Sequence, residues 1–341
     1  MRYLVTGAAG FIAARVCEML LEQGHDVVGV DNLNDAYDVR MKEYRLERLH
    51  TLPGRRAPAG EQPQAESPTR PGRFTFLHLD VADRGVIATL AAHAPFDAAI
   101  NLAARAGVRA SVRDPWAYVD TNMTGTLNLL ELCRHHAIPK FILASTSSIY
   151  GEDAPLPTPE TADSSHPLQP YAASKKGAEA MAHAYHYLFG IDVTVARFFT
   201  VYGPAGRPDM SVFRFIRWIS EGEPLRLNGD GTQSRGFTYV DDIARGVILA
   251  LQPLGFEIIN LGGHENITIN GLIALIERLV GKKAIIERHP FPQADMKANL
   301  ADVTKARQLL GWQPRVNLEE GLRRTIDWYF SERAWARELK V

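Results

Sequence analysis

Short apolar runs alternate with amphipathic segments along the first 196 residues of the chain. The apolar runs lie at residues 3–6, 27–30, 74–79, 98–102, 141–144 and 193–196. Their hydrophobic content is nearly continuous, which is typical of parallel strands covered on both faces. The segments between them show helical spacing near residues 11–23, 84–93, 115–136 and 171–189. This alternation predicts an α/β fold built on a doubly wound parallel Rossmann sheet.

The pattern becomes more mixed after residue 196. Strands are predicted at 225–227 and 256–260, and helices at 240–251, 268–280 and 318–333. Thr268 is a suitable N-cap for its helix, and Gly281 ends it. We therefore expect a Rossmann domain of residues 1–196 and 239–261. A smaller C-terminal α/β lobe of residues 197–238 and 262–341 would cover the carboxyl edge of the sheet, where such folds bind ligands.

Residues 51–73 interrupt the alternation. This segment is rich in proline, glycine and arginine and has almost no bulky apolar side chain. Such a composition buries too little apolar surface to order a chain. We therefore expect a surface insertion between a helix and the third strand.

Composition narrows the class of partner. The 341 residues are 46% hydrophobic and 23% charged, as in ordinary globular domains. The 38 lysines and arginines balance the 39 aspartates and glutamates, which argues against nucleic acid or an anionic membrane as the main partner. Cys17 and Cys133 fall in apolar helical patterns and are expected to be buried thiols. No apolar run approaches the roughly 18 residues of a membrane span, and the chain enters a strand without a signal segment, so we expect a cytoplasmic protein.

Glycines follow the first predicted strand directly. Gly7 permits a tight turn, and Gly10 lets the backbone approach a pyrophosphate at the start of the next helix. Asp31 ends the second strand, where a carboxylate accepts hydrogen bonds from the adenosine ribose and repels a 2′-phosphate. These features predict NAD rather than NADP. The ends of the third and fourth strands would supply Asp80 and Val81 near the adenine and Leu102, Ala103 and Ala104 along the pyrophosphate.

A phenol, an amine and a hydroxyl recur at spacings that suit proton transfer. Tyr171 and Lys175 are four residues apart and lie on one face of a predicted helix. An ammonium beside a phenol favours the phenolate, which would lower the pKa of Tyr171 from about 10 toward neutrality and make it a general base. Thr146, at the end of a predicted strand, would share a substrate oxygen with Tyr171. Taken alone, Tyr-x-x-x-Lys also occurs by chance on solvated helices.

These motifs together resemble the extended short-chain dehydrogenase/reductase family of nucleotide-sugar enzymes. The matching stretches are residues 6–12, 31–32, 101–104, 171–175 and 235–242. The resemblance implies that Tyr171 is the catalytic base, that Lys175 tunes it and holds the nicotinamide ribose, and that Thr146 binds the sugar hydroxyl. The implied cofactor contacts are Gly7, Gly10, Phe11, Ile12, Asp31, Asn32, Asn34, Asp80, Val81, Leu102, Ala103, Ala104, Asn122, Ser145, Tyr171, Lys175 and Phe199.

Within this family the chain resembles the UDP-glucuronate 4-epimerases, through residues 31–38, 106–109 and 198–210. That resemblance implies oxidation of C4 by a tightly bound NAD, rotation of the 4-keto sugar and reduction on its other face, so that UDP-glucuronate and UDP-galacturonate interconvert. The implied substrate contacts are Arg109, Thr146, Ser147, Ser148, Arg197, Thr200, Arg207, Met210, Ser211, Leu227, Arg235 and Asp295.

Residue 148 bears on the fate of the ketone. Related dehydratases and UDP-glucuronate decarboxylases carry an acid there, whereas this chain has Ser148. Ser147, Ser148 and Thr200 are expected to hold the sugar carboxylate through neutral hydrogen bonds. Arg197 either forks onto that carboxylate or forms a structural ion pair. Asn122 would hold the pyrophosphate region or position a water.

Three positions depart from the family pattern: Asn101 replaces a usual His, Arg105 a usual Gln and Gly236 a usual Asp. No metal site is expected, because the paired histidines have no acidic or cysteine partner in view. In this family, helices corresponding to residues 115–136 and 171–189 pair across a two-fold axis in a four-helix bundle. A homodimer is therefore expected, and a helix buried on two sides within one monomer is the alternative.

Other functions remain open from the sequence. A UDP-glucuronate decarboxylase and a UDP-glucose 4-epimerase would use the same initial chemistry. An NAD-binding sensor without turnover is a third possibility of another class. The joint presence of Thr146, Tyr171 and Lys175 argues against the sensor.

Overall fold

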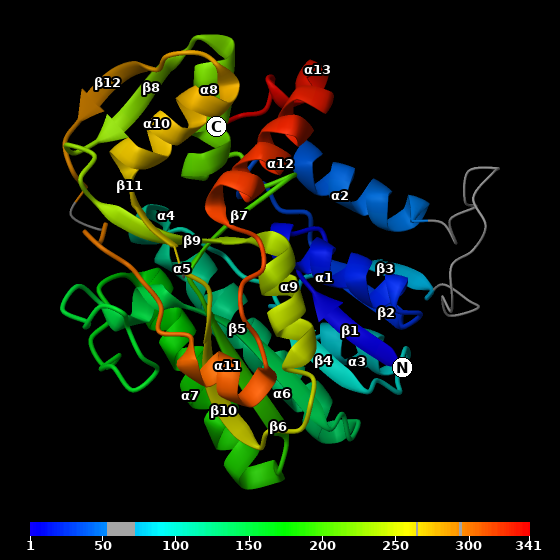
Figure 1. Cartoon of the computed structure of the whole chain (residues 1–341). Helices are drawn as coiled ribbons and strands as arrows, with labels where there is room; N and C mark the ends of the chain where they lie inside the picture. Colours follow the sequence, from blue (N-terminus) through cyan, green and yellow to red (C-terminus); the bar gives the residue numbers. More distant parts are fainter. Residues whose placement is uncertain (53–71, 264, 293–294) are drawn as a thin grey trace.

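A seven-stranded parallel sheet forms the centre of the protein. The computed structural model describes residues 1–52, 72–263, 265–292 and 295–341. Across the sheet the strands are β10 (Phe256–Leu261), β6 (Asp192–Phe198), β5 (Lys140–Thr146), β4 (Ala98–Asn101), β1 (Arg2–Thr6), β2 (Asp26–Asp31) and β3 (Phe74–His78). The chain starts in the middle and builds outward in both directions, which confirms the doubly wound fold (Figure 1).

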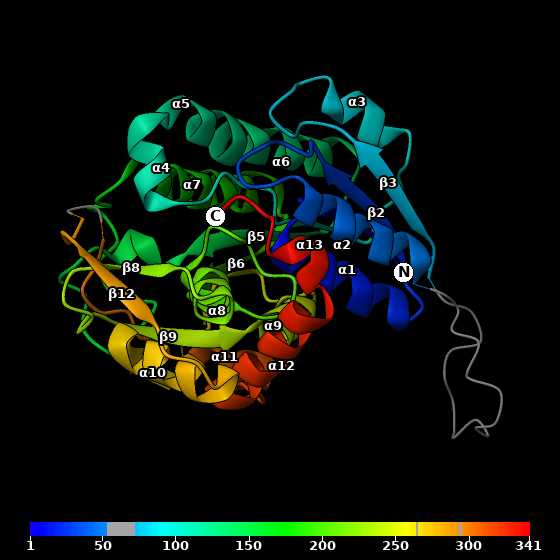
Figure 2. The same ribbon diagram turned by 90° about the horizontal axis from the view of Figure 1, so that it is seen from above.

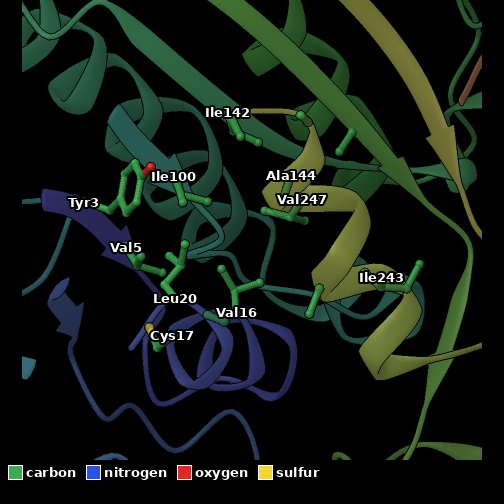
Figure 3. Packing of buried hydrophobic residues seen from close by; sticks show 14 of the residues in the cluster. Tyr3, Val5, Val16, Cys17, Leu20, Ile100, Ile142, Ala144, Ile243 and Val247 are labelled. Carbon is green, nitrogen blue, oxygen red and sulfur yellow. The ribbon is translucent and has the colours of Figure 1, made fainter. Parts of the chain in front are cut away.

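Helices cover both faces of this sheet (Figure 2). One face carries α3 (Val86–Ala91), α6 (Gly125–His135) and α7 (Pro170–Phe189), and the other carries α1 (Phe11–Glu22), α9 (Val240–Leu249) and α11 (Thr304–Leu310). Alternate residues of β1 point to opposite faces: Tyr3 and Val5 join the core beneath α1 and α9, and Leu4 joins the core beneath α3 and α6. Figure 3 shows the first of these cores, where Val16 and Leu20 of α1 meet Val247 of α9.

The predicted helix at 115–136 is divided in the structure. It comprises α5 (Pro115–Tyr118), a π-helical segment η1 (Val119–Thr124) and α6, and α4 (Val108–Arg113) precedes it. Asp114 caps α5 by accepting a hydrogen bond from the Ala117 amide at 3.4 Å. The prediction of a helical stretch at 115–136 is confirmed, and its middle part is π-helical, which the hydrophobic spacing does not reveal.

Smaller sheets and four helices build the C-terminal region. β11 (Glu265–Thr268), β9 (Ser234–Tyr239) and β7 (Thr200–Tyr202) form one sheet, and β12 (Ile285–His289) pairs with β8 (Pro224–Asn228) in another. Around them pack α8 (Ser211–Glu221), α10 (Ile269–Val280), α12 (Leu318–Ser331) and α13 (Arg333–Ala336). Thr268 caps α10 and Gly281 ends it in a left-handed conformation, as predicted. This region has its own apolar core, which Met41 of α2 (Arg40–Thr51) also joins.

The predicted insertion lies between α2 and β3. Thr51 ends α2 and β3 begins at Phe74, but residues 53–71 of the insertion lie outside the described residues. Within the described ranges, no helix combines the length and the apolar content that a membrane crossing requires.

Candidate active site

Thr146 and Tyr171 meet where β5 ends and α7 begins. Pro170 occupies the first turn of α7, where its fixed φ suits a helix start. The Thr146 hydroxyl lies near enough to the Tyr171 phenol to lower its pKa. Lys175, one turn further along α7, donates to the Ala144 carbonyl on β5 at 2.9 Å. The three predicted catalytic side chains therefore share one corner of the sheet.

Burial governs the protonation of this group. Removal from water raises the pKa of the Tyr171 phenol, and the nearby Thr146 hydroxyl and the positive charge of Arg207 oppose that rise. Burial lowers the pKa of Lys175 to about 8, and the nearby Glu179 carboxylate resists this fall. The expectation of a Tyr171 pKa lowered toward neutrality was therefore wrong for this state of the protein, because desolvation outweighs the favourable charges and Lys175 is held by a carbonyl.

Hydroxyl groups extend the corner beyond Thr146. The Thr146 Oγ1 accepts a hydrogen bond from the Ser148 amide at 3.2 Å and lies 3.3 Å from the Ser148 Oγ. This bond caps the 3₁₀-helical turn η2 (Ser147–Tyr150). Ser147, Ser148 and Thr146 are therefore consecutive hydroxyls on a rigid turn, with no acid among them.

The glycine loop after β1 has the geometry of a pyrophosphate cradle. Gly7 has φ +70°, and a Cβ there would lie 2.9 Å from the Ala103 backbone. A Cβ on Gly10 would lie 2.8 Å from the Gly7 carbonyl. Gly10 is also the N-cap residue of α1, so its loop leads into the positive end of a helix. These positions fit a dinucleotide, since only glycine lets the backbone come so close.

Asp31 ends β2 beside this loop. Its carboxylate accepts hydrogen bonds from the Ala9 amide at 3.2 Å and the Leu33 amide at 2.8 Å, and it lies 3.3 Å from the Lys42 ammonium. Asp31 and Lys42 are both buried. Lys42 was not predicted from the sequence, because its partner is eleven residues away across a turn and no short motif marks the pair.

Arg45 on α2 was also missed. Its guanidinium donates to the Ala9 carbonyl in the glycine loop at 3.0 Å and to the Ala205 carbonyl after β7 at 2.7 Å and 3.0 Å. A further bond of 2.7 Å reaches the Tyr37 hydroxyl. One buried arginine therefore joins the cofactor loop to the substrate side of the cleft.

Polar residues gather at the far end of the proposed cofactor site. Asn32 donates to Asp80 at 2.7 Å, and Asn34 donates to Asn32 at 2.6 Å. Val81 is buried, and its carbonyl accepts from Asn128 at 2.8 Å. The remaining predicted contacts lie in the loop after β4, along α1 and after β6: Leu102, Ala103, Ala104, Phe11, Ile12 and Phe199.

Two residues that are predicted to bind the cofactor, Asn122 and Ser145, form side-chain hydrogen bonds within the protein. Asn122 accepts from the Arg105 amide at 2.9 Å and donates to the Arg105 carbonyl at 3.1 Å and to Ser174 on α7 at 2.9 Å. Ser145 donates to Glu179 at 2.5 Å. Both side chains are buried, and their bonds hold α7 and the loop after β4 in place. Asn122 therefore fixes the loop that is predicted to lie along the pyrophosphate, and direct contacts of Asn122 and Ser145 with the cofactor stay predictions.

Arg197 forms the structural ion pair, not the carboxylate contact. Its guanidinium binds both oxygens of Glu179, at 2.9 Å and 2.7 Å, and the Tyr150 hydroxyl at 2.9 Å. Arg197 is 1% exposed and Glu179 is 3% exposed. The inclusion of Arg197 among the substrate contacts was therefore wrong, because Glu179, which the sequence analysis did not single out, takes its fork. Glu179 lies four residues after Lys175 on the same helical face, which was the available signal.

Three predicted arginines, Arg109, Arg207 and Arg235, form a group that we call the cationic wall. Arg109 pairs with Asp295 at 3.0 Å and 2.5 Å. Arg207 pairs with Asp209 at 2.7 Å and lies over the Tyr37 ring. Arg235 donates to the Met296 and Ser234 carbonyls at 2.6 Å and 2.7 Å. Burial and the charge of Arg109 lower the pKa of Arg235.

Arg214 was missed as a member of this cationic wall. Burial and the charge of Arg109 also lower its pKa, and its Nε is buried without a partner among the described residues. The wall therefore concentrates positive charge that a diphosphate would neutralise. The other predicted substrate residues lie on nearby elements: Thr200 on β7, Met210 and Ser211 at the start of α8, and Leu227, which is buried, on β8.

The departures from the family pattern have structural partners. Asn101 accepts from Thr6 at 2.8 Å and donates to Thr126 at 3.0 Å, which joins β1, β4 and α6. A Cβ on Gly236 would lie 2.6 Å from the Gly263 Cα, so the backbone at Gly263 leaves no room for a side chain at residue 236. In the described part of the chain, no group of three or more His, Cys, Asp or Glu side chains has the arrangement of a metal site.

Comparison with known proteins gives the family. Residues 3–262 match the model of the NAD dependent epimerase/dehydratase family. The chain is 51% identical over 340 residues to a UDP-glucuronate 4-epimerase of Thermodesulfobacterium geofontis, covering 99% of each protein. It is 34% identical over 345 residues to UDP-glucuronate 4-epimerase 2 of Arabidopsis thaliana, covering 96% of this chain and 75% of that protein.

A solved structure supports the same family. The Bacillus cereus UDP-glucuronic acid 4-epimerase, crystallised with UDP-glucuronic acid and NAD, superposes with a TM-score of 0.87 at 36% identity, covering 97% of this chain and 100% of that one. These matches span the glycine loop, the Thr146 corner and the cationic wall together. The resemblance inferred from the motifs is confirmed, and the chain belongs to the NAD dependent epimerase/dehydratase family.

Proposed function

We propose that the chain interconverts UDP-glucuronate and UDP-galacturonate by inverting C4. The observation that carries this proposal is the placement of the Thr146 hydroxyl near the Tyr171 phenol, beside a turn whose residues Ser147 and Ser148 have hydroxyls and no acid. Relatives at 51% and 34% identity, named UDP-glucuronate 4-epimerases, support the choice of substrate. The absence of a carboxylate at residue 148 argues against a dehydratase and, less strongly, against the decarboxylase.

The residues divide the chemistry among themselves. When bound in the glycine loop, NAD supplies the oxidation of C4 and its later reduction. Tyr171 takes the proton of the 4-hydroxyl and returns it, and Thr146 holds O4 in register with the phenol. Lys175, as an ammonium, stabilises the phenolate. The cofactor is regenerated in each turnover, so it stays bound.

The proposed division of the chain follows these roles. Residues 1–196 and 239–261 would hold NAD, and residues 197–238 and 262–341 would hold the UDP-sugar. Two apolar cores support this division in outline: α11 and Trp312 of the second region pack in the core of the first, and Met41 of the first region joins the core of the second. Arg109, Arg207 and Arg235 would neutralise the diphosphate.

Product analysis tests the proposed reaction. The purified protein is incubated with UDP-glucuronate, and the products are identified by proton NMR. UDP-galacturonate is the expected product, and Tyr171→Phe is the control that removes the base. UDP-xylose as the product would overturn the proposal in favour of decarboxylation, and no turnover by either form would favour a binding role.

A homodimer through helices near 115–136 and 171–189 is part of the proposal. Trp116 on α5 is 75% exposed, and Tyr187 and Leu188 on α7 are 81% and 64% exposed. Large apolar side chains at such exposure favour contact with another surface. Sedimentation should give twice the 37.8 kDa chain mass, and Trp116→Asp with Tyr187→Asp should give the monomer. A monomeric parent protein at micromolar concentration would contradict this interface.

A further inference from the structure

Asn299 reaches from the C-terminal region to the hydroxyl turn of the active site. Its Nδ2 donates to the Ser147 Oγ at 2.8 Å. The two side chains are 8% and 6% exposed, so water does not compete for the bond. A cavity of about 130 Å³ lies beside the pair, and Ser147, Phe199 and Asn299 help to line it.

The backbone around Asn299 is fixed on both sides. Its carbonyl accepts from the Gly236 amide on β9 at 2.7 Å. The next carbonyl, of Leu300, accepts from the Thr158 amide at 2.8 Å. The amide of Asn299 therefore projects from a segment that is clamped between β9 and the loop after η2.

This bond determines what the Ser147 hydroxyl can do. A serine hydroxyl has one proton to donate and two lone pairs. When an amide N–H donates to one of these lone pairs, the hydroxyl keeps its own proton, and that proton is the group that can bind an anion. Among the described residues, Ser147 Oγ has no acceptor partner for that proton.

The other end of the amide argues against a purely structural role. The Asn299 Oδ1 is buried and has no hydrogen-bond partner in the part of the chain that the structure describes. An unpaired buried carbonyl destabilises the folded state, and an apolar side chain of the same size would avoid that cost. Stability alone therefore does not account for an asparagine at this position.

We propose that Asn299 is a positioning residue for substrate choice, acting through Ser147. By donating to the Ser147 Oγ it turns the hydroxyl proton outward, toward the C6 carboxylate of a uronate. A sugar with a neutral C6 hydroxymethyl group gains much less from a fixed donor, because a bond to a charged acceptor is about twice as strong. This inference rests on the proposed function.

Steady-state kinetics of Asn299→Leu test the inference. The KM for UDP-glucuronate should rise about tenfold, as for the loss of one charge-assisted hydrogen bond. The inhibition constant of UDP-glucose should change less than about threefold, since its C6 group is neutral. Asn128→Leu is the matched control, because Asn128 is also buried and donates a single Nδ2 bond of 2.8 Å, to Val81. It should leave the ratio of the two constants unchanged.

A double-mutant cycle separates positioning from folding. In a Ser147→Ala background, Asn299→Leu should raise the KM for UDP-glucuronate less than twofold, because the group through which it acts is gone. Equal effects with and without Ser147, or equal effects on both sugars, would overturn the inference. Asn299→Asp, which would take the Ser147 proton instead of filling a lone pair, should weaken UDP-glucuronate binding more than Asn299→Leu does.

Wild-type turnover keeps the two proposals apart. If the parent protein makes no UDP-galacturonate, the proposed function fails and the Asn299 data are read only as binding constants. If the parent protein is active and the Asn299 variants behave as Asn128→Leu does, only the inference about Asn299 fails.

Discussion

The site has two walls of charged residues, one formed by the buried Glu179–Arg197 pair and one by the arginines of the cationic wall. The two walls hold their charges in opposite ways. Between α7 and β6, the charged groups of Glu179 and Arg197 are buried and bind each other. In the cationic wall, Arg109 is exposed while it pairs with Asp295, and Arg235 donates to backbone carbonyls. Buried pairs fix geometry, whereas accessible cations stay ready for an anionic ligand. Changes on the first wall should therefore affect catalysis and folding, and changes on the second should affect binding.

The largest effect is expected at the base itself. Tyr171→Phe keeps the ring against Tyr118, 6.0 Å away between centroids, but removes the group that moves the proton. General base catalysis contributes about 10²–10⁴-fold, so kcat should fall by about that factor. Steady-state assays measure the fall, and the amount of NAD that copurifies should not change. A fall of less than tenfold would show that another group carries the proton.

The buried pair should dominate stability. Arg197→Met removes the cation that binds both oxygens of the buried Glu179 and leaves Lys176, 3.6 Å away, as a remaining cation, which should lower the free energy of unfolding by about 3 kcal/mol. Chemical denaturation measures this change. Arg324→Met is the control, because Arg324 pairs with Glu320 at 2.8 Å on the surface, and it should cost less than about 0.5 kcal/mol. Similar losses for the two variants would break the contrast between the walls.

The cationic wall should control affinity. Hydrogen bonds to charged groups contribute about 1.5–3 kcal/mol, so Arg235→Leu should raise the KM for UDP-glucuronate about 10- to 100-fold with kcat nearly unchanged. Arg278→Leu, at an exposed pair with Glu319, should leave KM unchanged. A loss confined to kcat would place Arg235 with the catalytic wall.

The pH dependence should follow Lys175. Its pKa of about 8 lies below the ordinary 10.5, so between these values the unfolded chain binds more protons there than the folded one. The contribution of Lys175 to stability therefore rises with pH, while kcat falls as the ammonium discharges near pH 8. Rate profiles of the parent and Lys175→Arg check this, since arginine stays charged. An identical descending limb in both would assign the titration to another group.

The smallest effect is expected at Ser148. Ser148→Glu places an acid beside the ketone and should divert a minor fraction of turnover to the pentose. Chromatography of the products after a long incubation would detect UDP-xylose. Reduced epimerisation without any pentose would show that residue 148 does not control the fate of the intermediate.

Local patterns predicted the parts of the site that are local. The seven strands, the glycine loop and the Tyr171–Lys175 spacing depend on neighbouring residues and on helical or strand periodicity, so they are visible in the chain. The sequence does not show which side chains become partners in the folded protein. Arg197 could meet a substrate or Glu179, and only the packing of β6 against α7 decides which. Lys42, Arg45 and Asn299 were missed for the same reason, since their partners lie across turns or in another lobe.

Arg45 holds together two loops of the proposed active site. It binds the loop that would cradle the cofactor, through Ala9, and the loop after β7, through Ala205. Widening the gap between these loops must break buried, charge-assisted bonds. Arg45 should therefore keep the proposed cofactor loop closed against the loop after β7.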